Sequence, residues 1–383
     1  MSSSAPGRPS TGLDVGDFGA QFDDWLQQQP PALRAAQQPH PGTDQHMAAM
    51  RGLMAALHEA GWSRYGWPER AGGLGGSLRH RAAMWQALAR HGVTGMAAFE
   101  HLEVLGPTLL ELGPPEFTAD VFPRFLDGTQ AWCQGFSEPD AGSDLAALRT
   151  RAVPDGDAYR VSGRKIWTSW ARFAKWCLLL ARTGPAEARH RSITALIVDM
   201  ESPGVAVRSL EQANGRDELA EVTFDDVAVP AGRVVGAPEG GWAVAMHILG
   251  HERGTFAWFR HCFLLRHLED ELAFAGPETD GLLEDALLDM ASVRAVSAAA
   301  VASRDEGTLL GPSAAYTKLL LCSAEQSMND WALATDSDIA AGPLEGTAEE
   351  ARAAYFFSRI VTIYGGSKQM QLDTVAKQIL KLP

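Results

Sequence analysis

Hydrophobic residues in the first part of the chain recur every three or four positions, which is the period of an amphipathic helix. The stretch from Gln45 to Leu126 carries this pattern, with a glycine-rich break at Gly72–Gly76 and an end at Gly113-Pro-Pro. It predicts helices over residues 46–60, 79–91 and 98–112. Residues 1–45 are rich in Gln, Pro, Ser and Gly, so we expect a disordered or loop-forming tail there, without a signal peptide.

The hydrophobic period changes at about Thr129. Short runs of β-branched and aromatic residues now alternate with turn residues, and Pro154-Asp-Gly-Asp157 is typical of a hairpin turn. The pattern predicts an antiparallel barrel or sandwich. Its strands are expected over residues 130–137, 149–153, 158–161, 164–169, 176–181, 192–199, 205–208 and 221–227.

Helical spacing returns after Pro230 and continues to the end. It predicts four long helices, which suggest a bundle, over residues 241–274, 282–305, 314–334 and 348–380. The expected fold is a multidomain α+β chain. Its parts are a tail, an N-terminal α-helical domain, a middle antiparallel β-barrel domain and a C-terminal four-helix bundle, over residues 1–45, 46–128, 129–233 and 234–383.

Net charge, apolar runs and cysteine spacing limit what the protein is expected to bind. The formal net charge of −14 disfavours nucleic acid, and it leaves the attraction of an anionic ligand to local arginines. No apolar run reaches the ~18 residues of a membrane span. The four cysteines are scattered without a Cys-x-x-Cys pair, which argues against a metal site or a disulfide framework and fits a reducing cytoplasm.

Two short motifs in the β region carry candidate chemistry. Ser137-Glu-Pro-Asp-Ala-Gly-Ser143 is typical of a strand that ends in a turn, where Gly142 lets a ligand approach the backbone and exposed N–H groups suit a phosphate or a ring carbonyl. Lys165-Ile-Trp-Thr-Ser169 places a tryptophan beside small hydroxyl residues at a strand end, where it could support a flat cofactor. The first motif alone also fits an ordinary structured turn.

Together, at this spacing, the two motifs resemble the middle domain of the acyl-CoA dehydrogenases, a family of FAD-dependent enzymes. The resemblance extends to Gly66–Gly76 in the first helical region and to Phe224-Asp-Asp-Val-Ala-Val-Pro230 at the end of the β region. It implies an oxidoreductase that removes hydrogen from the α- and β-carbons of an acyl thioester. The acyl carrier would be coenzyme A or an acyl carrier protein, and an electron-transfer flavoprotein would accept the electrons.

The resemblance also assigns cofactor contacts. Residues that would line the flavin ring come from both motifs and are Gln134, Phe136, Ser137, Trp167 and Ser169. Residues that would approach the FAD pyrophosphate or the pantetheine arm of the substrate, or complete the cofactor site near the C-terminus, are Gly142, Ser143, Ser367 and Gln369. Family members often have an aromatic residue at the first of these positions, so Gln134 departs from their pattern.

The implied reaction needs a carboxylate beside the α-carbon, desolvated so that its pKa rises. Many members carry it as the Glu of a Tyr-Glu-Gly-Thr segment, but here that segment reads Tyr364-Gly-Gly-Ser367, so the usual base is absent. Helical spacing instead places Glu252 on an apolar stripe formed by Ala245, Leu249 and Phe256. A carboxylate in such a place is costly unless it is paired or protonated.

A subset of the family, which includes the isovaleryl-CoA and long-chain acyl-CoA dehydrogenases, carries the base as the Glu of a Glu-Arg pair on this helix. Those members have Gly or Ala at the C-terminal position. Glu252-Arg253 with Gly365 matches both halves of this exchange, so the resemblance assigns the base to Glu252. The Gly365 backbone N–H would polarise the thioester carbonyl, while Arg253, Tyr364 and Ser143 would contact the substrate. The alternative is a structural pairing of Glu252 with an arginine.

Two elements by which homotetrameric members hold FAD across subunits are missing from the sequence. No Arg-x-x-Phe-Gly segment follows His267, and the region 336–345 lacks the Gln-x-x-Gly-Gly-x-Gly motif. The chain would therefore form a homodimer or homotetramer with a divergent clamp, or be one of two unlike chains in a heterotetramer. A flavin monooxygenase such as an N-hydroxylase, and a non-catalytic partner subunit, are the competing functions.

Overall fold

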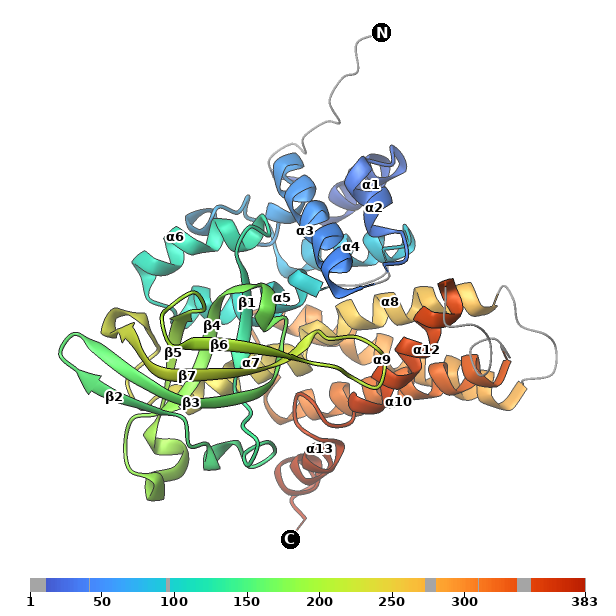
Figure 1. Cartoon of the computed structure of the whole chain (residues 1–383). Helices are drawn as coiled ribbons and strands as arrows, with labels where there is room; N and C mark the ends of the chain where they lie inside the picture. The colour runs from blue at the N-terminus through green and yellow to red at the C-terminus, as the bar shows by residue number, and fades with distance from the viewer. Residues whose placement is uncertain are drawn as a thin grey trace.

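The computed structural model describes residues 12–40, 42–93, 97–272, 280–308, 310–335 and 346–382. These residues form an N-terminal helical domain, a middle β domain and a C-terminal helical domain, which is the expected order (Figure 1). The N-terminal helices lie above the sheet, and the long helices α8, α9 and α10 extend to one side of it (Figure 1).

The N-terminal domain contains helices α1 to α6. Their bounds are Val15–Gln27, Pro31–Ala36, Thr43–Ala60, Leu78–Arg90, Ala97–Leu112 and Pro115–Leu126. The prediction of a disordered or loop-forming tail over 1–45 is wrong for α1 and α2. Asp14 caps α1 by accepting the Asp17 N–H at 2.8 Å, and Phe18 and Phe22, one turn apart, are fully buried in the core of this domain. Residues 1–11 and 41 lie outside the described residues.

The β domain contains strands β1 to β8. Their bounds are Ala131–Gly135, Arg151–Asp155, Ala158–Ser169, Ala174–Arg182, Ile193–Asp199, Val205–Leu210, Leu219–Pro230 and Val234–Val235. Their order in the sheet is β6-β7-β3-β2-β4-β5-β8, and β1 pairs with β4. The prediction of a purely antiparallel sheet is wrong in one respect, because β1 and β2 both run parallel to β4. The two strands expected over 158–161 and 164–169 form the single strand β3.

Strand β4 lies at the centre of the molecule, and almost its whole length is buried. Side chains alternate across a strand, so Leu178 and Leu180 join the core shared with the helices while Cys177 and Leu179 join the core inside the β domain. This one strand therefore links the β domain to the helical domains on one of its faces.

The C-terminal domain contains α7 to α10, α12 and α13, followed by a π-helical turn at Val375–Ile379. The helix bounds are Gly241–Arg253, Thr255–Leu272, Asp280–Asp305, Ala314–Thr335, Gly346–Ile360 and Lys368–Thr374. The continuous helices predicted over 241–274 and 348–380 are both broken. Gly254 leaves the helical region at φ −99° and ψ −93°. Gly365 and Gly366 adopt left-handed φ values of 63° and 91° between α12 and α13, where glycine is favoured.

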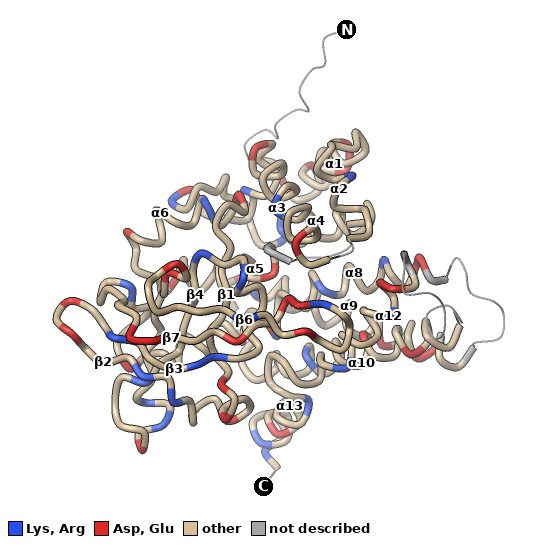
Figure 2. Tube along the Cα trace, viewed as in Figure 1, with Lys and Arg blue, Asp and Glu red and all other residues tan. Residues whose placement is uncertain are grey.

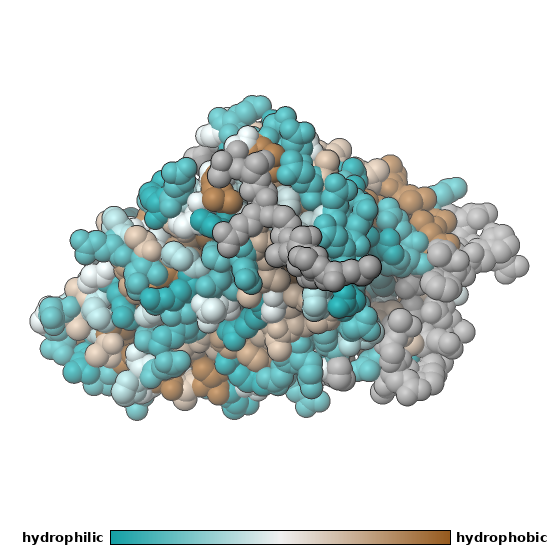
Figure 3. All heavy atoms as spheres, turned by 90° about the horizontal axis from the view of Figure 1, so that it is seen from above, coloured by the Kyte–Doolittle hydropathy of each residue, from teal (hydrophilic) through white to brown (hydrophobic). Residues whose placement is uncertain are grey.

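Helix α9 is long and apolar enough to cross a membrane by length and composition alone, but it is a core helix of the bundle. Its residues Ala286, Met290 and Val293 are buried in one cluster with residues of α8 and α10. Acidic and basic residues are interspersed over all three domains (Figure 2), and the face seen from above is mainly hydrophilic with small apolar groups (Figure 3).

Candidate active site

A buried ion pair joins the two sequence motifs of the β domain. Lys165 Nζ lies 2.8 Å from Glu138 Oε1 and donates a second hydrogen bond to the Phe136 carbonyl oxygen at 3.0 Å. Glu138 also accepts the backbone N–H groups of Arg149 and Thr150 at 2.6 and 2.8 Å. Burial opposes the charge of Glu138, but Lys165 and these hydrogen bonds hold its pKa below the ordinary value. The ion pair between Glu138 and Lys165 therefore holds the two motifs next to each other.

The second motif presents an exposed indole on a strained backbone. Trp167 has a left-handed φ of 60° and lies where the pairing of β3 with β7 is irregular, between Lys165 and Thr168. Its side chain is 60% exposed, which is unusual for a tryptophan. A bulky residue keeps such a conformation only where its surroundings impose it, often at functional sites. The exposed ring fits the expected support for a flat cofactor.

Two buried polar atoms without a hydrogen-bond partner within the described residues, and a glycine with open space beside it, also fit a bound cofactor. Gln134 Oε1 and Thr168 Oγ1 are buried and have no hydrogen-bond partner within the described residues. A Cβ atom added to Gly142 would meet no heavy atom of the described chain within 4 Å, and its φ is not left-handed, so packing within the described residues does not require glycine there. The neighbouring Ser143 is exposed. These groups provide hydrogen-bonding capacity and room for a cofactor at the motif edge of the sheet.

The remaining predicted cofactor residues lie on two segments. Phe136, Ser137 and Ser169 are partly buried next to the ends of β1 and β3, where the Ile166 N–H donates to the Ser137 carbonyl oxygen at 3.0 Å. Ser367 caps α13 by accepting the Met370 N–H at 3.3 Å, and Gln369 in the first turn of that helix is exposed. The structure brings the β-domain residues together, whereas Ser367 and Gln369 form a separate group.

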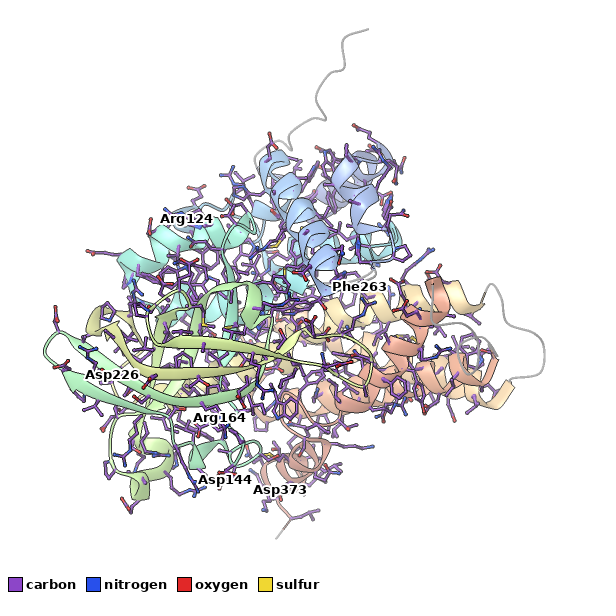
Figure 4. All side chains as sticks on the ribbon, viewed as in Figure 1. Arg124, Asp144, Arg164, Asp226, Phe263 and Asp373 are labelled. Atoms are coloured by element: carbon purple, nitrogen blue, oxygen red, sulfur yellow. The ribbon has the colours of Figure 1, made fainter. Side chains whose placement is uncertain are left out.

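Figure 4 shows how these two groups lie in the whole molecule. Asp144, which follows the first motif, and Asp373, on α13, are on the same side of the molecule in this view (Figure 4). Helix α13, which Ser367 caps, therefore lies on the same side of the molecule as the loop of the first motif in this view.

Glu252 lies in the last turn of α7, in a desolvated position. Burial raises the pKa of its carboxyl group, and the positive charges of Lys318 and Arg253 offset part of this effect. The side chain nevertheless keeps some accessible surface, so it borders solvent-accessible space. A desolvated but reachable carboxylate is what proton abstraction from carbon requires.

Gly365 faces this carboxylate directly. A Cβ atom at Gly365 would lie 2.6 Å from Glu252 Oε1, which is closer than real Cβ contacts, so position 365 can hold a side chain only if the Glu252 carboxylate moves. Arg253 Nε donates to the Gly365 carbonyl oxygen at 2.7 Å and fixes the loop. The Gly365 N–H makes no hydrogen bond within the described residues. Arg253 thus positions the loop in this structure.

Sequence reasoning missed two charged residues near Glu252. Lys318 on α10 is 3% exposed, and its Nζ lies 3.9 Å from the centroid of the Tyr364 ring. It is one helical turn from the buried residues Ala314 and Cys322, so its place on the core-facing side of a predicted helix was a usable signal. Glu100, in the first turn of α5, lies far from Glu252 in the sequence and gave no such signal.

The contact between Gly365 and Glu252 gives a direct test. Gly365→Leu is expected to lower kcat/KM about 100-fold, because the new side chain displaces the carboxylate and a shift of ~1 Å costs a reaction that much. Gly156→Leu is the matched control, since Gly156 has the same φ of 63° but a Cβ there meets nothing within 4 Å. Equal losses in the two variants, measured by steady-state kinetics, would attribute the effect to backbone strain alone.

Helical, β and helical domains in this order, with a desolvated carboxylate beside a glycine loop, define a three-domain flavoprotein dehydrogenase. The family models agree: the acyl-CoA dehydrogenase N-terminal domain matches residues 32–129, the middle domain 133–227 and the C-terminal domain 239–380. Acyl-CoA dehydrogenase IpdE1 of Mycobacterium tuberculosis is 36% identical over 378 residues, which cover 97% of this chain and 98% of that protein. The chain therefore belongs to the acyl-CoA dehydrogenase family, whose members are flavoprotein oxidoreductases.

Further similar proteins are of the same kind. IpdE1 of Mycolicibacterium smegmatis is 35% identical over 354 residues, covering 89% of this chain and 87% of that protein. Among solved structures, the Tcur3481-Tcur3483 steroid ACAD has a TM-score of 0.79 at 26% identity and covers 96% of this chain and 97% of its own. The ChsE4-ChsE5 complex from Mycobacterium tuberculosis has a TM-score of 0.76 at 25% identity, covering 98% of this chain and 99% of its own.

Proposed function

We propose that this acyl-CoA dehydrogenase introduces a double bond between the α- and β-carbons of an acyl-CoA, with Glu252 as the base. The observation that carries the proposal is the 2.6 Å approach between the Glu252 carboxylate and the side-chain position of Gly365. In family members with a glutamate at the position of Gly365, the base acts from that side chain. The Glu252 carboxylate lies next to the place that such a side chain would take. The two residues fit the exchange of the base between helix and loop.

The chain's own residues divide the work of the reaction. Glu252 takes the α-proton, and its desolvation makes it a stronger base than an exposed carboxylate. The Gly365 N–H donates to the thioester carbonyl and stabilises the negative charge that develops there. Arg253 holds the Gly365 loop through the carbonyl oxygen of that residue. The positive charge of Lys318 favours the carboxylate form of Glu252 and offsets part of the rise in its pKa that burial causes.

FAD is the cofactor that we propose, and when bound it supplies the acceptor for the hydride that leaves the β-carbon. Trp167, Gln134 and Thr168 would contact its ring system, because they combine an exposed aromatic face with unpaired polar atoms. Gly142 would allow the cofactor or the pantetheine arm to approach the backbone. We further propose an electron-transfer flavoprotein as the electron acceptor and the cytoplasm as the location.

Anaerobic titration with a panel of saturated acyl-CoAs tests this function. Bleaching of the flavin absorbance together with formation of the 2-enoyl-CoA supports it, because both require transfer of hydrogen from the substrate. Consumption of oxygen by reduced flavin, with no thioester oxidised under anaerobic conditions, would instead support a monooxygenase.

A second proposal concerns the assembly. We infer that a related but different chain completes the FAD site, because both sequence elements of the homotetrameric clamp are missing. Two of the similar solved structures are also named after a pair of different proteins, Tcur3481-Tcur3483 and ChsE4-ChsE5. The C-terminal domain also has apolar side chains that are about half exposed or more and could pack on another chain. They include Leu287, Leu288, Ile363, Leu380 and Leu382.

The flavin content of the isolated chain tests the assembly. Purified without a second chain, the protein is expected to retain well under one FAD per chain, because the two clamp elements that would hold FAD across subunits are missing from this sequence. Flavin absorbance per protein and mass by light scattering measure this. A homo-oligomer with one FAD per chain would contradict the proposal.

A further inference from the structure

A recess of about 360 Å³ lies where the N-terminal helical domain meets the C-terminal helical domain. Its walls come from the loop before α4, from α4 and α5, and from the last turns of α7 and α9. Among the described residues that line it, one carboxylate, that of Glu111, stands against three arginines, which are Arg70, Arg81 and Arg304. The formal net charge of −14 gives no reason to expect such a positive recess.

Arg81 is built into the wall of this recess. It is 6% exposed, and its guanidinium carbon lies 3.8 Å from the centroid of the Trp67 ring. Gly66 has a left-handed φ of 79°, and a Cβ atom there would lie 2.6 Å from Arg81 Cγ, so the glycine makes room for the arginine stem. Glu103 Oε2 lies 3.3 Å from Arg81 Nε, but no guanidinium nitrogen of Arg81 donates a hydrogen bond within the described residues. The loop therefore fixes a buried cation that keeps donors to spare.

Arg304 brings a second positive charge to the recess from the C-terminal domain. Its Nη2 donates to His251 Nε2 at 2.8 Å. Burial and the positive charge of Arg304 lower the pKa of His251 to about 2, so this partner is a neutral imidazole. The neighbouring Asp305 pairs with Arg79 at 3.1 Å instead, and no ion pair to Arg304 is found within the described residues. The charge of Arg304 therefore lacks a bound counter-ion from the described chain.

The recess joins these charges to apolar walls. Leu78, Pro107 and Leu110 line it, and Glu111, its carboxylate, is engaged by His247 at 3.0 Å. Guanidinium groups bind carboxylates and phosphates through paired N–H donors, while apolar walls suit the organic part of a ligand. Small-molecule sites measure about 300–1,000 Å³, so a recess of about 360 Å³ has room for more than a bare inorganic ion.

We propose that this recess binds a small organic anion, which presents a carboxylate or phosphate group to Arg81 and Arg304 and its apolar part to the walls. The site is separate from the proposed base, because His251 lines the recess whereas Glu252, the next residue of α7, does not. Consecutive residues of a helix point about 100° apart. The bound anion would bridge the N-terminal and C-terminal domains, and its binding does not depend on the dehydrogenase function.

Isothermal titration calorimetry of the purified protein, saturated with FAD, tests the proposal. The probes are benzoate and phenyl phosphate, which differ in the anionic group, and benzamide, which is a neutral analogue of benzoate. We expect at least one of the two anions to bind, and benzamide to bind more weakly than that anion by about 10-fold or more, because it offers no charge to the arginines. The anion that binds more tightly identifies the group that the recess prefers.

Two variants show whether the anion binds in this recess. Arg304→Gln removes the charge but keeps an amide donor, and it should weaken anion binding about 10- to 100-fold. Arg70→Gln, an exposed change, should weaken it about 2- to 5-fold. Arg90→Gln is the matched control, because Arg90 is an exposed arginine of α4 that does not line the recess, and it should bind as the wild type does.

Thermal unfolding verifies that each of these variants folds. Three results would each overturn the inference while the dehydrogenase function stands. They are no binding of either anion, binding of benzamide as tight as that of the anions, and wild-type affinity in folded Arg304→Gln.

Discussion

Glu252→Gln is expected to lower kcat by about 10²- to 10⁴-fold, the usual contribution of a general base, while flavin binding and folding are retained. The amide has nearly the same shape as the carboxylate but cannot accept the α-proton. Stopped-flow mixing with acyl-CoA under anaerobic conditions measures the rate of flavin bleaching. Glu116→Gln, an exposed change on α6, is the control and should leave the rate unaltered. Full activity of Glu252→Gln would show that Glu252 is not the base.

The raised pKa of Glu252 also predicts how activity and stability depend on pH. Glu252 acts as a base only when it is ionised, and burial raises its pKa above that of an exposed glutamate. The kcat/KM of the wild type should therefore rise with pH through this raised pKa, and Glu252→Gln should lose this limb. For stability the same shift has the opposite sense: the protonated acid fits the folded state best, so its contribution is present at low pH and is lost as pH rises through the raised pKa.

Transfer of the carboxylate sharpens the same test. The double variant Glu252→Gly with Gly365→Glu is expected to recover part of the lost rate, because the side-chain position of 365 lies 2.6 Å from the present carboxylate oxygen. Recovery will be incomplete, since a non-glycine residue at a φ of 63° is strained. No recovery at all in a folded, flavin-bound double variant would show that the two positions do not serve one reaction.

Lys165→Met is expected to destabilise the β domain by about 3–5 kcal/mol, because it leaves Glu138 as an uncompensated buried charge. Lys165 is fully buried and also supports the Phe136 carbonyl oxygen. The measurement is the free energy of unfolding in urea for the transition that reports the β domain. Flavin affinity should fall as well, since the ion pair joins the two motifs.

Two controls separate burial from charge in this second prediction. Lys175→Met removes a lysine that pairs with Asp199 and Glu201 but is a quarter exposed, so it should cost only ~0–1 kcal/mol. Adding Glu138→Gln to Lys165→Met should recover part of the stability, because the stranded charge disappears while an oxygen remains for a backbone N–H. A loss for Lys165→Met no larger than that for Lys175→Met would refute the structural role of the buried pair.

The sequence predicted the domain order and most strands, because hydrophobic periodicity reports burial directly. The prediction of helices failed where a single glycine breaks a run of residues that otherwise has helical spacing. Gly254 and Gly365 lie in runs with good helical spacing. Only the backbone shows that Gly254 caps the end of α7 and that Gly365 lies in the break between α12 and α13. The first helices were hidden by a Gln- and Pro-rich composition, although Phe18 and Phe22 already lay one turn apart.

The candidate site was predictable only as far as its motifs. The Glu252-Arg253 pair and the glycine at 365 are visible in the sequence. Only the coordinates show that a side chain at 365 would meet the Glu252 carboxylate, because Glu252 lies on α7 and Gly365 lies between α12 and α13. Glu138 and Lys165 belong to the recognised motifs, yet only the fold shows that they pair with each other. Glu100 joins this region from the N-terminal domain, and no local pattern marks it.

Exchange of the α-proton tests the central claim most directly, because it isolates the work of Glu252 from hydride transfer. The flavin-bound protein is incubated anaerobically in deuterated water with a saturated acyl-CoA, and mass spectrometry follows deuterium at the α-carbon. The account predicts exchange by the wild type and by Glu116→Gln, and a loss of about 10²-fold or more in Glu252→Gln. Exchange at the wild-type rate in Glu252→Gln would contradict it.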